Sequence, residues 1–253
     1  MKIFNTLSEW RLFRQSLPQQ HDLGFVPTMG NLHKAHASLV QKSLNDNHLT
    51  LVSLFINPTQ FNNPDDFKHY PKTIEEDIAL LQRMNVDFCL IPEKSDLYPD
   101  DYRYRIEEQQ LSLMLEGVDR PGHFTGMLTV VMKLLQLAKP KRAYFGEKDQ
   151  QQLQLIQGMV DAFFMDVALI PCPIVRETSG LAYSSRNQRL SPLGRQTAEH
   201  FAQIFQKNIP CSEIKNQLNS LDLILNYLEE HDGIRYIAIT IEGVRLIDNK
   251  KII

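Results

Sequence analysis

Short apolar runs alternate with segments whose apolar residues recur at helical spacing through the first 170 residues of the chain. The runs are rich in Val, Ile, Leu and Phe, as strands buried on both faces usually are. Strands that alternate with helices predict a parallel, doubly wound sheet. The predicted strands are 23–27, 49–56, 87–91, 142–146 and 166–170.

Helices are predicted in the segments that separate these strands. Thr73 and Glu76 have the spacing of a capping box, which predicts the start of one helix. Pro140 ends another, because proline cannot continue a helix. A long polar loop is expected over 57–73. The predicted helices are 35–46, a segment from Thr73 to about Met84, 126–138, and a segment that begins near Asp149.

The pattern changes after Arg186, where two amphipathic segments are followed by two strand-like runs. Glu242 and Gly243 lie between the two runs, and such a pair is typical of a hairpin turn. Helices followed by a hairpin predict a separate small α+β unit. The predicted helices are 190–205 and 212–230, and the predicted strands are 234–241 and 244–248.

The composition is that of an ordinary globular protein, with 43% hydrophobic and 23% charged residues. A chain of 253 residues fits one large domain, or a main domain with a small appendage. The formal net charge is −3, which disfavours a dedicated nucleic-acid-binding protein.

Cysteine usage and the N-terminus favour a soluble cytoplasmic protein. Cys89, Cys172 and Cys211 are far apart and form no CxxC motif, which is typical of reduced thiols rather than disulfides or a zinc site. The N-terminal segment carries charges throughout and lacks the apolar core of a signal peptide. No apolar run approaches the ~20 residues of a membrane span.

Four polar motifs are expected at transitions from strands to helices. In an open parallel sheet, ligands bind beyond the carboxyl ends of the strands. The shared location is therefore more informative than any one motif. The motifs are "PTMGNLHKAH" (27–36), "NPTQF" (57–61), "FGEKDQQQL" (145–153) and "SSRN" (184–187).

His33 and His36 are candidates for phosphate binding. A metal site is disfavoured, because metalloprotease helices use H-E-x-x-H, whereas these histidines are three apart with no glutamate between them. Two surface or capping histidines are the simple alternative. In the first turn of a helix, however, unpaired N–H groups and the helix dipole favour phosphate. Gly30 allows the preceding turn to approach a ligand closely.

Lys148 and Asp149 lie where a predicted strand gives way to a helix, and Ser184, Ser185 and Arg186 lie in one loop. The first pair is equally compatible with a solvated charge run, and the loop with a polar connector between domains. Together with the two histidines, these side chains suit a polyphosphate whose transition-state charge must be spread.

Three amide side chains, those of Asn57, Gln60 and Gln152, are candidates for binding a hydroxylated or carboxylated small molecule, which they would orient without repelling it. The Asn-Pro pair is also a common turn former. Arg120 and His123 precede a predicted helix, and spacing alone does not separate a functional role from a Pro-Gly turn. The residues therefore predict a small-molecule, nucleotide-using α/β enzyme.

Several long segments, in order from near residue 24 to near residue 192, closely resemble the pantothenate synthetase (pantoate–β-alanine ligase) family. This family belongs to the HIGH-motif nucleotidylyltransferase superfamily, which includes class I aminoacyl-tRNA synthetases. The resemblance implies a Rossmann-like doubly wound parallel sheet (1–185) with a small α+β C-terminal lid domain (186–253), and usually a homodimer. The segments are "VPTMGNLHKAH", "LFINPTQFNNPDDFKHYPKTIEEDI", "LEGVDRPGHFTGMLTVVMKLLQL", "YFGEKDQQQL", "PIVRETSGLAYSSRNQRLS" and the terminal "RLIDN".

The resemblance implies an ATP-dependent condensation of (R)-pantoate with β-alanine, in pantothenate and coenzyme A biosynthesis. The pantoate carboxylate would attack the α-phosphorus of ATP to give enzyme-bound pantoyl adenylate and diphosphate. The amine of β-alanine would then displace AMP. Mg²⁺ would accompany the triphosphate, held mainly by phosphate oxygens and water.

The resemblance also implies roles for single residues. The catalytic residues would be His36, His33, Lys148 and Arg186. ATP would be bound by Met29, Gly30, Asn31, Leu32, His33, Lys34, Ala35, His36, Gly146, Glu147, Lys148, Asp149, Val175, Tyr183, Ser184, Ser185 and Arg186. Pantoate would be bound by Asn57, Gln60 and Gln152, and β-alanine by Gln60.

The chain departs from the family pattern in three places. Ala35 stands in the glycine position of H-x-G-H, Tyr183 stands where the family usually has Met or Leu, and only 67 residues follow Arg186.

One alternative function is a nucleotidylyltransferase that keeps the nucleotide on its product, and "NPTQF" with Gln152 argues against it. The other alternative is a catalytically silent nucleotide- or tRNA-binding relative. The acidic charge balance of the chain and the retained polar residues argue against it.

Overall fold

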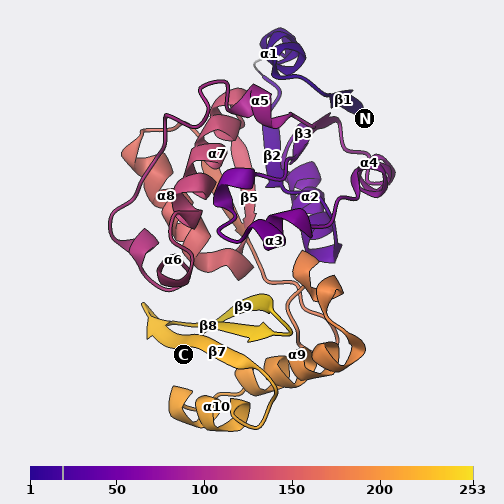
Figure 1. Ribbon diagram of the computed structural model, residues 1–253. Helices are drawn as coiled ribbons and strands as arrows, with labels where there is room; N and C mark the ends of the chain where they lie inside the picture. The colour runs from indigo at the N-terminus through magenta and orange to yellow at the C-terminus, as the bar shows by residue number, and fades with distance from the viewer. Residues whose placement is uncertain (19, 253) are drawn as a thin grey trace. The chain divides into compact units, whose positions relative to one another are not determined.

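The computed structural model describes residues 1–18 and 20–252 (Figure 1). The chain folds into two compact units, which are described separately below. The first comprises Met1–Leu32, His36–Gly146 and Gln151–Cys172. The second comprises His33–Ala35, Glu147–Gln150 and the chain from Pro173 onward. The domain division expected after residue 185 stays a prediction, because packing into units does not by itself show independent folding.

The first unit is built on a six-stranded parallel sheet with the order β1-β4-β3-β2-β5-β6. From β2 the chain proceeds through β3 to β4 on one side, and through β5 to β6 on the other. This is the order of a doubly wound, Rossmann-like sheet with β1 added at one edge, so the predicted fold class is confirmed. The strands are β1 (Lys2–Phe4), β2 (Leu23–Thr28), β3 (Leu49–Leu54), β4 (Phe88–Leu90), β5 (Arg142–Gly146) and β6 (Ala168–Cys172).

The central strands are mostly apolar because helices cover both faces of the sheet. Phe25 and Leu51 point to a core that includes residues of α1, α7 and α8. Val26 and Val52, their neighbours in sequence, point to a core formed with α2 and α4. The helices of the first unit are α1 (Leu7–Ser16), α2 (Lys34–Asp46, which begins in the second unit), α3 (Pro64–Lys68), α4 (Ile74–Arg83), α5 (Lys94–Leu97), α6 (Glu116–Asp119), α7 (His123–Ala138) and α8 (Gln150–Ala162). The first unit also has two short 3₁₀ helices, η1 (Pro58–Gln60) and η2 (Leu111–Leu113). A third, η3 (Glu147–Asp149), belongs to the second unit, as does Gln150 at the start of α8.

The capping box predicted for α4 is wrong. Thr73 is the N-cap residue, but its side chain makes no capping hydrogen bond. Its hydroxyl instead donates to the carboxylate of Asp77 at 3.2 Å. That buried carboxylate also accepts hydrogen bonds from the loop after β2, so a long-range contact outweighs the local capping pattern.

The first 22 residues contain elements that the hydrophobic pattern did not predict. Strand β1 has three residues, too few for a periodic signal, and pairs with β4. Helix α1 contacts the C-terminal end of α7. There Trp10 Nε1 donates to the carbonyl oxygen of Leu137 at 2.8 Å, and Arg14 Nε donates to that of Ala138 at 2.9 Å. These bonds pair carbonyls that the helix end leaves unsatisfied.

The second unit contains a three-stranded antiparallel sheet, β7-β8-β9, with two helices packed on one face (Figure 1). Glu242 and Gly243 form the predicted hairpin turn, with φ of 52° and 74°, as a type I′ turn requires. The core includes Phe201 and Phe205 from α9 and Ile237 from β8. The elements are η4 (Ser185–Arg189), α9 (Pro192–Phe205), α10 (Cys211–Leu218), β7 (Ile224–His231), β8 (Ile234–Ile241) and β9 (Val244–Lys251).

The helix predicted over 212–230 is wrong beyond Leu218, where α10 ends. Residues 219–223 form a turn, and from Ile224 the segment is β7, which pairs with β8. Leu221, Leu225 and Leu228 recur at helical spacing, but the alternation from Ile224 onward also suits a half-buried strand. Pairing with β8 decides between the two.

Candidate active site

Three of the four polar motifs leave neighbouring strands of the first unit. Strand β2 ends at Thr28, β3 at Leu54 and β5 at Gly146, and β2 lies between the other two. The chain order reverses between β2 and β5. Parallel sheets bind ligands outside such a switch point.

The loop after β2 is held by a buried carboxylate that the sequence analysis did not identify. Asp77 in α4 accepts hydrogen bonds from the backbone N–H groups of Asn31 at 2.8 Å and Leu32 at 2.7 Å. Gly30 and Asn31 both have positive φ, 79° and 49°. At Gly30 a Cβ would also lie 3.0 Å from the Asp77 carboxylate. The glycine is therefore required for this turn, whereas Asp77, one of three acids in the first turn of α4, carries no sequence signal of its role.

The two histidines of "HKAH" stand at the start of α2. His33 immediately precedes the helix, and His36 lies in its first turn, as predicted. No acidic residue occupies that first turn, so no side-chain carboxylate there offsets the positive end of the helix dipole. The start of α2 is therefore suited to an anion.

Asn57 and Gln60, predicted as a pair, lie together in the first unit. Asn57 Nδ2 donates to Gln60 Oε1 at 3.0 Å and to the carbonyl oxygen of Gly126 at 3.1 Å. The Tyr98 hydroxyl donates to Asn57 Oδ1 at 2.8 Å, and Gln60 Nε2 donates to the sulfur of Met29. Burial raises the pKa of Tyr98 to about 12, so Tyr98 stays a donor at neutral pH. These bonds fix which end of each amide faces its neighbours.

Arg120 and His123, whose role the sequence left open, hold the backbone of Gln60. The carbonyl oxygen of Gln60 lies 2.8 Å from His123 Nδ1. A carbonyl only accepts, so Nδ1 carries the hydrogen. Arg120 donates to His123 Nε2 at 3.1 Å, which gives a neutral ring, and to Glu116 at 3.4 Å. At Gly126 a Cβ would lie 2.2 Å from the carbonyl oxygen of Thr59, so glycine allows α7 to pack against this segment.

His33 lies in the second unit beside Tyr183, one of the departures from the family pattern. The two rings are stacked, with centroids 6.0 Å apart, and Lys34 Nζ lies 6.0 Å from the Tyr183 ring centroid. The pKa of His33 is lowered to about 4, first by burial and then by the positive charge of Lys148, while Asp149 opposes the shift. His33 is therefore neutral at pH 7 and offers a hydrogen bond without charge.

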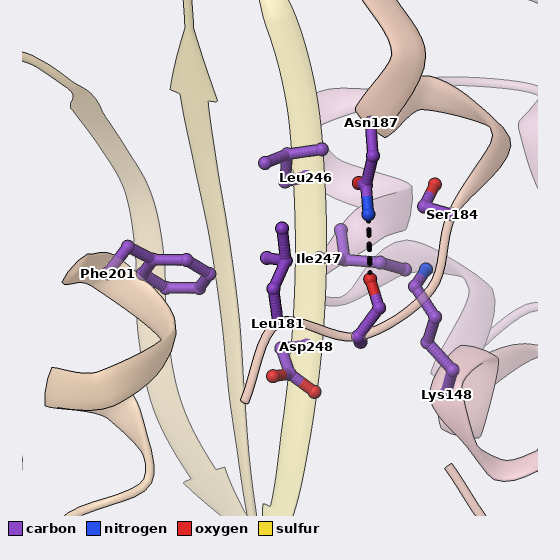
Figure 2. A pocket seen from close by; sticks show the side chains of 9 residues that line it. Lys148, Leu181, Ser184, Asn187, Phe201, Leu246, Ile247 and Asp248 are labelled. Atoms are coloured by element: carbon purple, nitrogen blue, oxygen red, sulfur yellow. Dashed lines mark hydrogen bonds between the residues drawn. The ribbon is translucent and has the colours of Figure 1, made fainter. Parts of the chain in front are cut away.

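A pocket in the second unit contains residues of two predicted motifs (Figure 2). Lys148 extends into it, and Ser184 lies on the same side. The Ser184 hydroxyl accepts from the backbone N–H of Arg186 at 3.2 Å and so caps η4. Asn187 donates to the carbonyl oxygen of Ala182 at 3.0 Å. The lining residues are Lys148, Leu181, Ala182, Ser184, Asn187, Phe201, Leu246, Ile247 and Asp248.

Strand β9 supplies two buried polar residues for which the sequence analysis predicted no role. Asp248 accepts two hydrogen bonds from Arg176, at 2.6 and 2.9 Å. Burial raises the pKa of this carboxyl group, and the Arg176 guanidinium opposes the rise. Asn249 Nδ2 donates to the carbonyl oxygens of Glu147 and Lys148, each at 2.8 Å. The "RLIDN" segment signalled these residues only as part of the family resemblance.

The predicted site residues divide between the two units, and their roles in binding remain predictions. Within the second unit the backbone N–H of Tyr183 donates to the carbonyl oxygen of Val175 at 3.1 Å. Gln152 is half-buried in α8, and the neighbouring Gln151 bonds to the carbonyls of Leu111 and Met114. Those in the first unit are Met29, Gly30, Asn31, Leu32, His36, Asn57, Gln60, Gly146 and Gln152. Those in the second are His33, Lys34, Ala35, Glu147, Lys148, Asp149, Val175, Tyr183, Ser184, Ser185 and Arg186.

The described residues contain neither a cluster of metal-ligating side chains nor a helix able to span a membrane. Within 1–18 and 20–252, no group of three or more His, Cys, Asp and Glu side chains is placed to hold a metal ion. Over the same residues, no helix has the length and apolarity needed to cross a bilayer.

The amino-acid sequence matches the pantoate-beta-alanine ligase family over residues 2–251. The chain belongs to this family. It is 54% identical over 249 residues to a pantothenate synthetase of Legionella pneumophila (strain Corby), which covers 98% of this chain and 99% of the relative. It is 48% identical over 248 residues to that of Coxiella burnetii (strain Dugway 5J108-111), covering 98% and 96%. The predicted family and enzyme class, a ligase, are confirmed.

Solved structures of the pantoate-beta-alanine ligase family have the same fold. The enzyme from Francisella tularensis, solved in complex with beta-gamma ATP and beta-alanine, has a TM-score of 0.96 at 42% identity, covering 99% of this chain and 97% of that chain. The pantothenate synthetase from Thermus thermophilus has a TM-score of 0.91 at 35% identity, covering 99% of both chains. The short C-terminal segment after Arg186 is therefore compatible with the family fold.

Proposed function

We propose that the chain condenses (R)-pantoate with β-alanine at the expense of ATP, through an enzyme-bound pantoyl adenylate. One observation carries the proposal: a family member that covers 99% of this chain at 42% identity was solved with an ATP compound and β-alanine. The amide, histidine and lysine side chains described above supply the chemistry that these substrates need.

In the first step a carboxylate oxygen of pantoate bonds to the α-phosphorus of ATP. The bond from that phosphorus to the bridging oxygen breaks, and diphosphate leaves. A free carboxylate resists attack by an amine, so the adenylate supplies the leaving group for the second step. Negative charge spreads over the phosphate oxygens as the bond breaks, and donors placed there stabilise it. We assign this role to His36, Lys148 and Arg186, with neutral His33 as an uncharged donor.

In the second step the amine nitrogen of β-alanine bonds to the acyl carbon of the adenylate. The carbon–oxygen bond to AMP breaks, the amine loses its proton to solvent, and pantothenate and AMP result. Asn57, Gln60 and Gln152 are assigned to pantoate, and Gln60 also to β-alanine. Both substrates carry carboxylates, so neutral amides bind them without charge repulsion. The Tyr98 and Gly126 contacts of Asn57 keep its amide in one orientation before the substrates arrive.

Mg²⁺ is proposed to accompany ATP and to neutralise part of the triphosphate charge when bound. Mg²⁺ prefers phosphate and water oxygens and uses few protein ligands in such complexes. A protein that offers no cluster of ligands within the described residues fits this mode of binding.

The test measures AMP formation from ATP, (R)-pantoate and β-alanine, with each substrate omitted in turn. We expect AMP only when all three are present. With pantoate present and β-alanine absent, the enzyme should exchange labelled diphosphate into ATP, because adenylation precedes amide formation. Full turnover without this exchange would contradict a separate adenylation step.

A nucleotidylyltransferase of the same superfamily is the alternative function, and its product would retain the nucleotide. Release of free AMP in step with pantothenate excludes it. We further propose that the protein is a cytoplasmic homodimer, as its family resemblance implies. Sedimentation equilibrium tests the dimer, for which one protomer has a mass of 29.3 kDa.

A further inference from the structure

Strand β9 of the second unit is bonded to the segment that carries Lys148. The side-chain amide of Asn249 donates one hydrogen bond to each of two consecutive backbone carbonyls, those of Glu147 and Lys148. Both distances are 2.8 Å, and Asn249 is only 6% exposed. One rigid amide group therefore fixes two adjacent peptide units of η3, and with them the direction in which the Lys148 side chain leaves the backbone.

Asn249 is itself held from the opposite side. Its backbone N–H donates to Asp248 Oδ1 at 2.8 Å, and its carbonyl oxygen accepts from Arg176 at 3.3 Å. The same arginine holds the Asp248 carboxylate with two further bonds. Planar, two-point pairing of this kind is among the strongest hydrogen-bonded contacts in proteins. The position of Asn249 is thus determined by a buried ion pair.

Exposure distinguishes the Asn249 contact from an ion pair that β9 also makes with this segment. Asp248 and Lys148 both line the pocket of the second unit (Figure 2), and the Asp248 carboxyl group is buried with a 1% exposed side chain. The Lys148 side chain is 18% exposed. By contrast, the ion pair of Lys251 with Glu147 is on the surface, with Lys251 74% exposed. Surface ion pairs contribute little to the stability of the contacts they make. The amide of Asn249 is therefore the main buried restraint that β9 places on this segment.

We propose that Asn249 is a positioning residue for Lys148. The inference rests on the proposed function, in which the Lys148 ammonium stabilises charge on the phosphates of ATP. A donor contributes fully to a transition state only when it is held in place beforehand. A displacement of about 1 Å costs up to about 100-fold in rate. Asn249 would thus act on the reaction without touching the substrate.

The first experiment is a double-mutant cycle on diphosphate–ATP exchange with pantoate present. Asn249→Ala should lower kcat by about 10- to 100-fold, with the KM for ATP changed less than about threefold. In a Lys148→Ala background the same substitution should cost less than about threefold, because the residue it positions is already absent. An equal loss in both backgrounds would overturn the inference.

The matched control is Asn226→Ala in β7 of the same sheet. Asn226 is exposed and accepts a hydrogen bond from Thr240, so the substitution should leave kcat unchanged. If Asn249→Ala fails to fold, as judged by far-ultraviolet circular dichroism, Asn249→Ser replaces it. Serine keeps one donor hydrogen, and an exchange rate between those of wild type and Lys148→Ala is expected. Wild-type exchange by a folded Asn249→Ser or Asn249→Ala protein would contradict the proposal.

A second experiment does not depend on activity. Acetic anhydride labels lysine amines, and mass spectrometry gives the rate at each site. Asn249→Ala should raise the labelling rate of Lys148 several-fold and leave that of exposed Lys215 unchanged. An unchanged Lys148 rate would overturn the inference. Absence of exchange in the wild-type protein would contradict the proposed function alone, since the labelling result still decides whether Asn249 positions Lys148.

Discussion

At the scale of single residues, the charge state of His33 sets its part in the proposed reaction. Its pKa of about 4 follows from burial first and from the positive charge of Lys148 second. An imidazole that stays neutral adds a hydrogen bond to a phosphate oxygen without bringing a second positive charge close to Lys148. In the proposed reaction, Lys148 would therefore supply positive charge, and His33 would supply a directed hydrogen bond.

This shift makes the stability of the folded chain depend on pH. An unfolded histidine gains its proton near pH 6.5, whereas folded His33 gains it near pH 4. Between these values the unfolded state binds more protons, so the free energy of unfolding rises with pH. We expect urea midpoints to fall as the pH is lowered from 6.5 to 4. His33→Asn should reduce the slope of the urea midpoint plotted against pH.

The control for this measurement is His200→Asn, at an exposed position in α9. It should retain the slope of the unsubstituted protein. An identical pH dependence in His33→Asn would show that the acid sensitivity arises elsewhere.

The charge stabilisation proposed for His36 and Lys148 leads to a kinetic prediction. Removal of one preorganised donor costs ~2.7–4 kcal/mol in the transition state. His36→Ala and Lys148→Ala should therefore each lower kcat/KM by about 10²- to 10³-fold, with circular dichroism unchanged. Exposed Lys215→Ala in α10 serves as the comparison and should retain full activity. A loss below about tenfold in either variant would reduce that residue to a role in orienting ATP.

At the scale of elements, the buried strands were predictable and several of their contacts were not. β2, β3 and β5 lie within a residue or two of the predicted spans, because strands covered on both faces are continuously apolar. The helix predicted over 212–230 includes β7, since Leu221, Leu225 and Leu228 recur at helical spacing and a register shift between Leu225 and Tyr227 interrupts the alternation of the strand. Its true state depends on pairing with β8, which local sequence does not encode.

The residues of the candidate site were likewise only partly predictable from the sequence. Gly30 and the two histidines were found from turn chemistry and from the position of helix starts. Asp77 and Asn249 were not, because each acts on backbone atoms that lie far away in the sequence. Such partners are chosen by the tertiary fold, and neither residue belongs to a short motif with a chemical signature.

The start of α7 is an element whose side chains restrain Gln60, and this can be tested at His123. The ring of His123 donates to the carbonyl oxygen of Gln60 and is only 7% exposed. His123→Ala removes that donor and leaves space beside the η1 backbone. We expect the KM for pantoate to rise by about tenfold or more, with a smaller change in the KM for ATP, because Gln60 is assigned to pantoate and not to the nucleotide.

His69→Ala provides the same substitution at an exposed residue that follows α3. It should leave both Michaelis constants unchanged. An equal rise in both constants for His123→Ala would indicate a general loss of structure instead of a loss at Gln60.

At the scale of the whole molecule, the apolar residues form separate cores. Two clusters lie on the faces of the parallel sheet in the first unit. A third, which contains Phe201 and Ile237, lies in the second unit. A domain is a part of the chain with its own core that is able to fold alone. We therefore propose that the two units are two cooperative folding units. The second core already includes Leu181, so the boundary between them would lie somewhat before the predicted position after residue 185.

Hydrogen exchange in the native state tests this proposal. Phe201 is buried in the second unit, with 1% exposure, and Phe25 is fully buried in the first. Truncation of a core Phe to Ala costs ~3–5 kcal/mol. If the units open separately, Phe201→Ala should lower the protection of amides in β8 by up to this amount and leave those in β3 unchanged. Phe25→Ala should do the reverse. A loss of protection shared equally by β3 and β8 in either variant would show that the chain unfolds as one cooperative unit, and the boundary would then have no thermodynamic meaning.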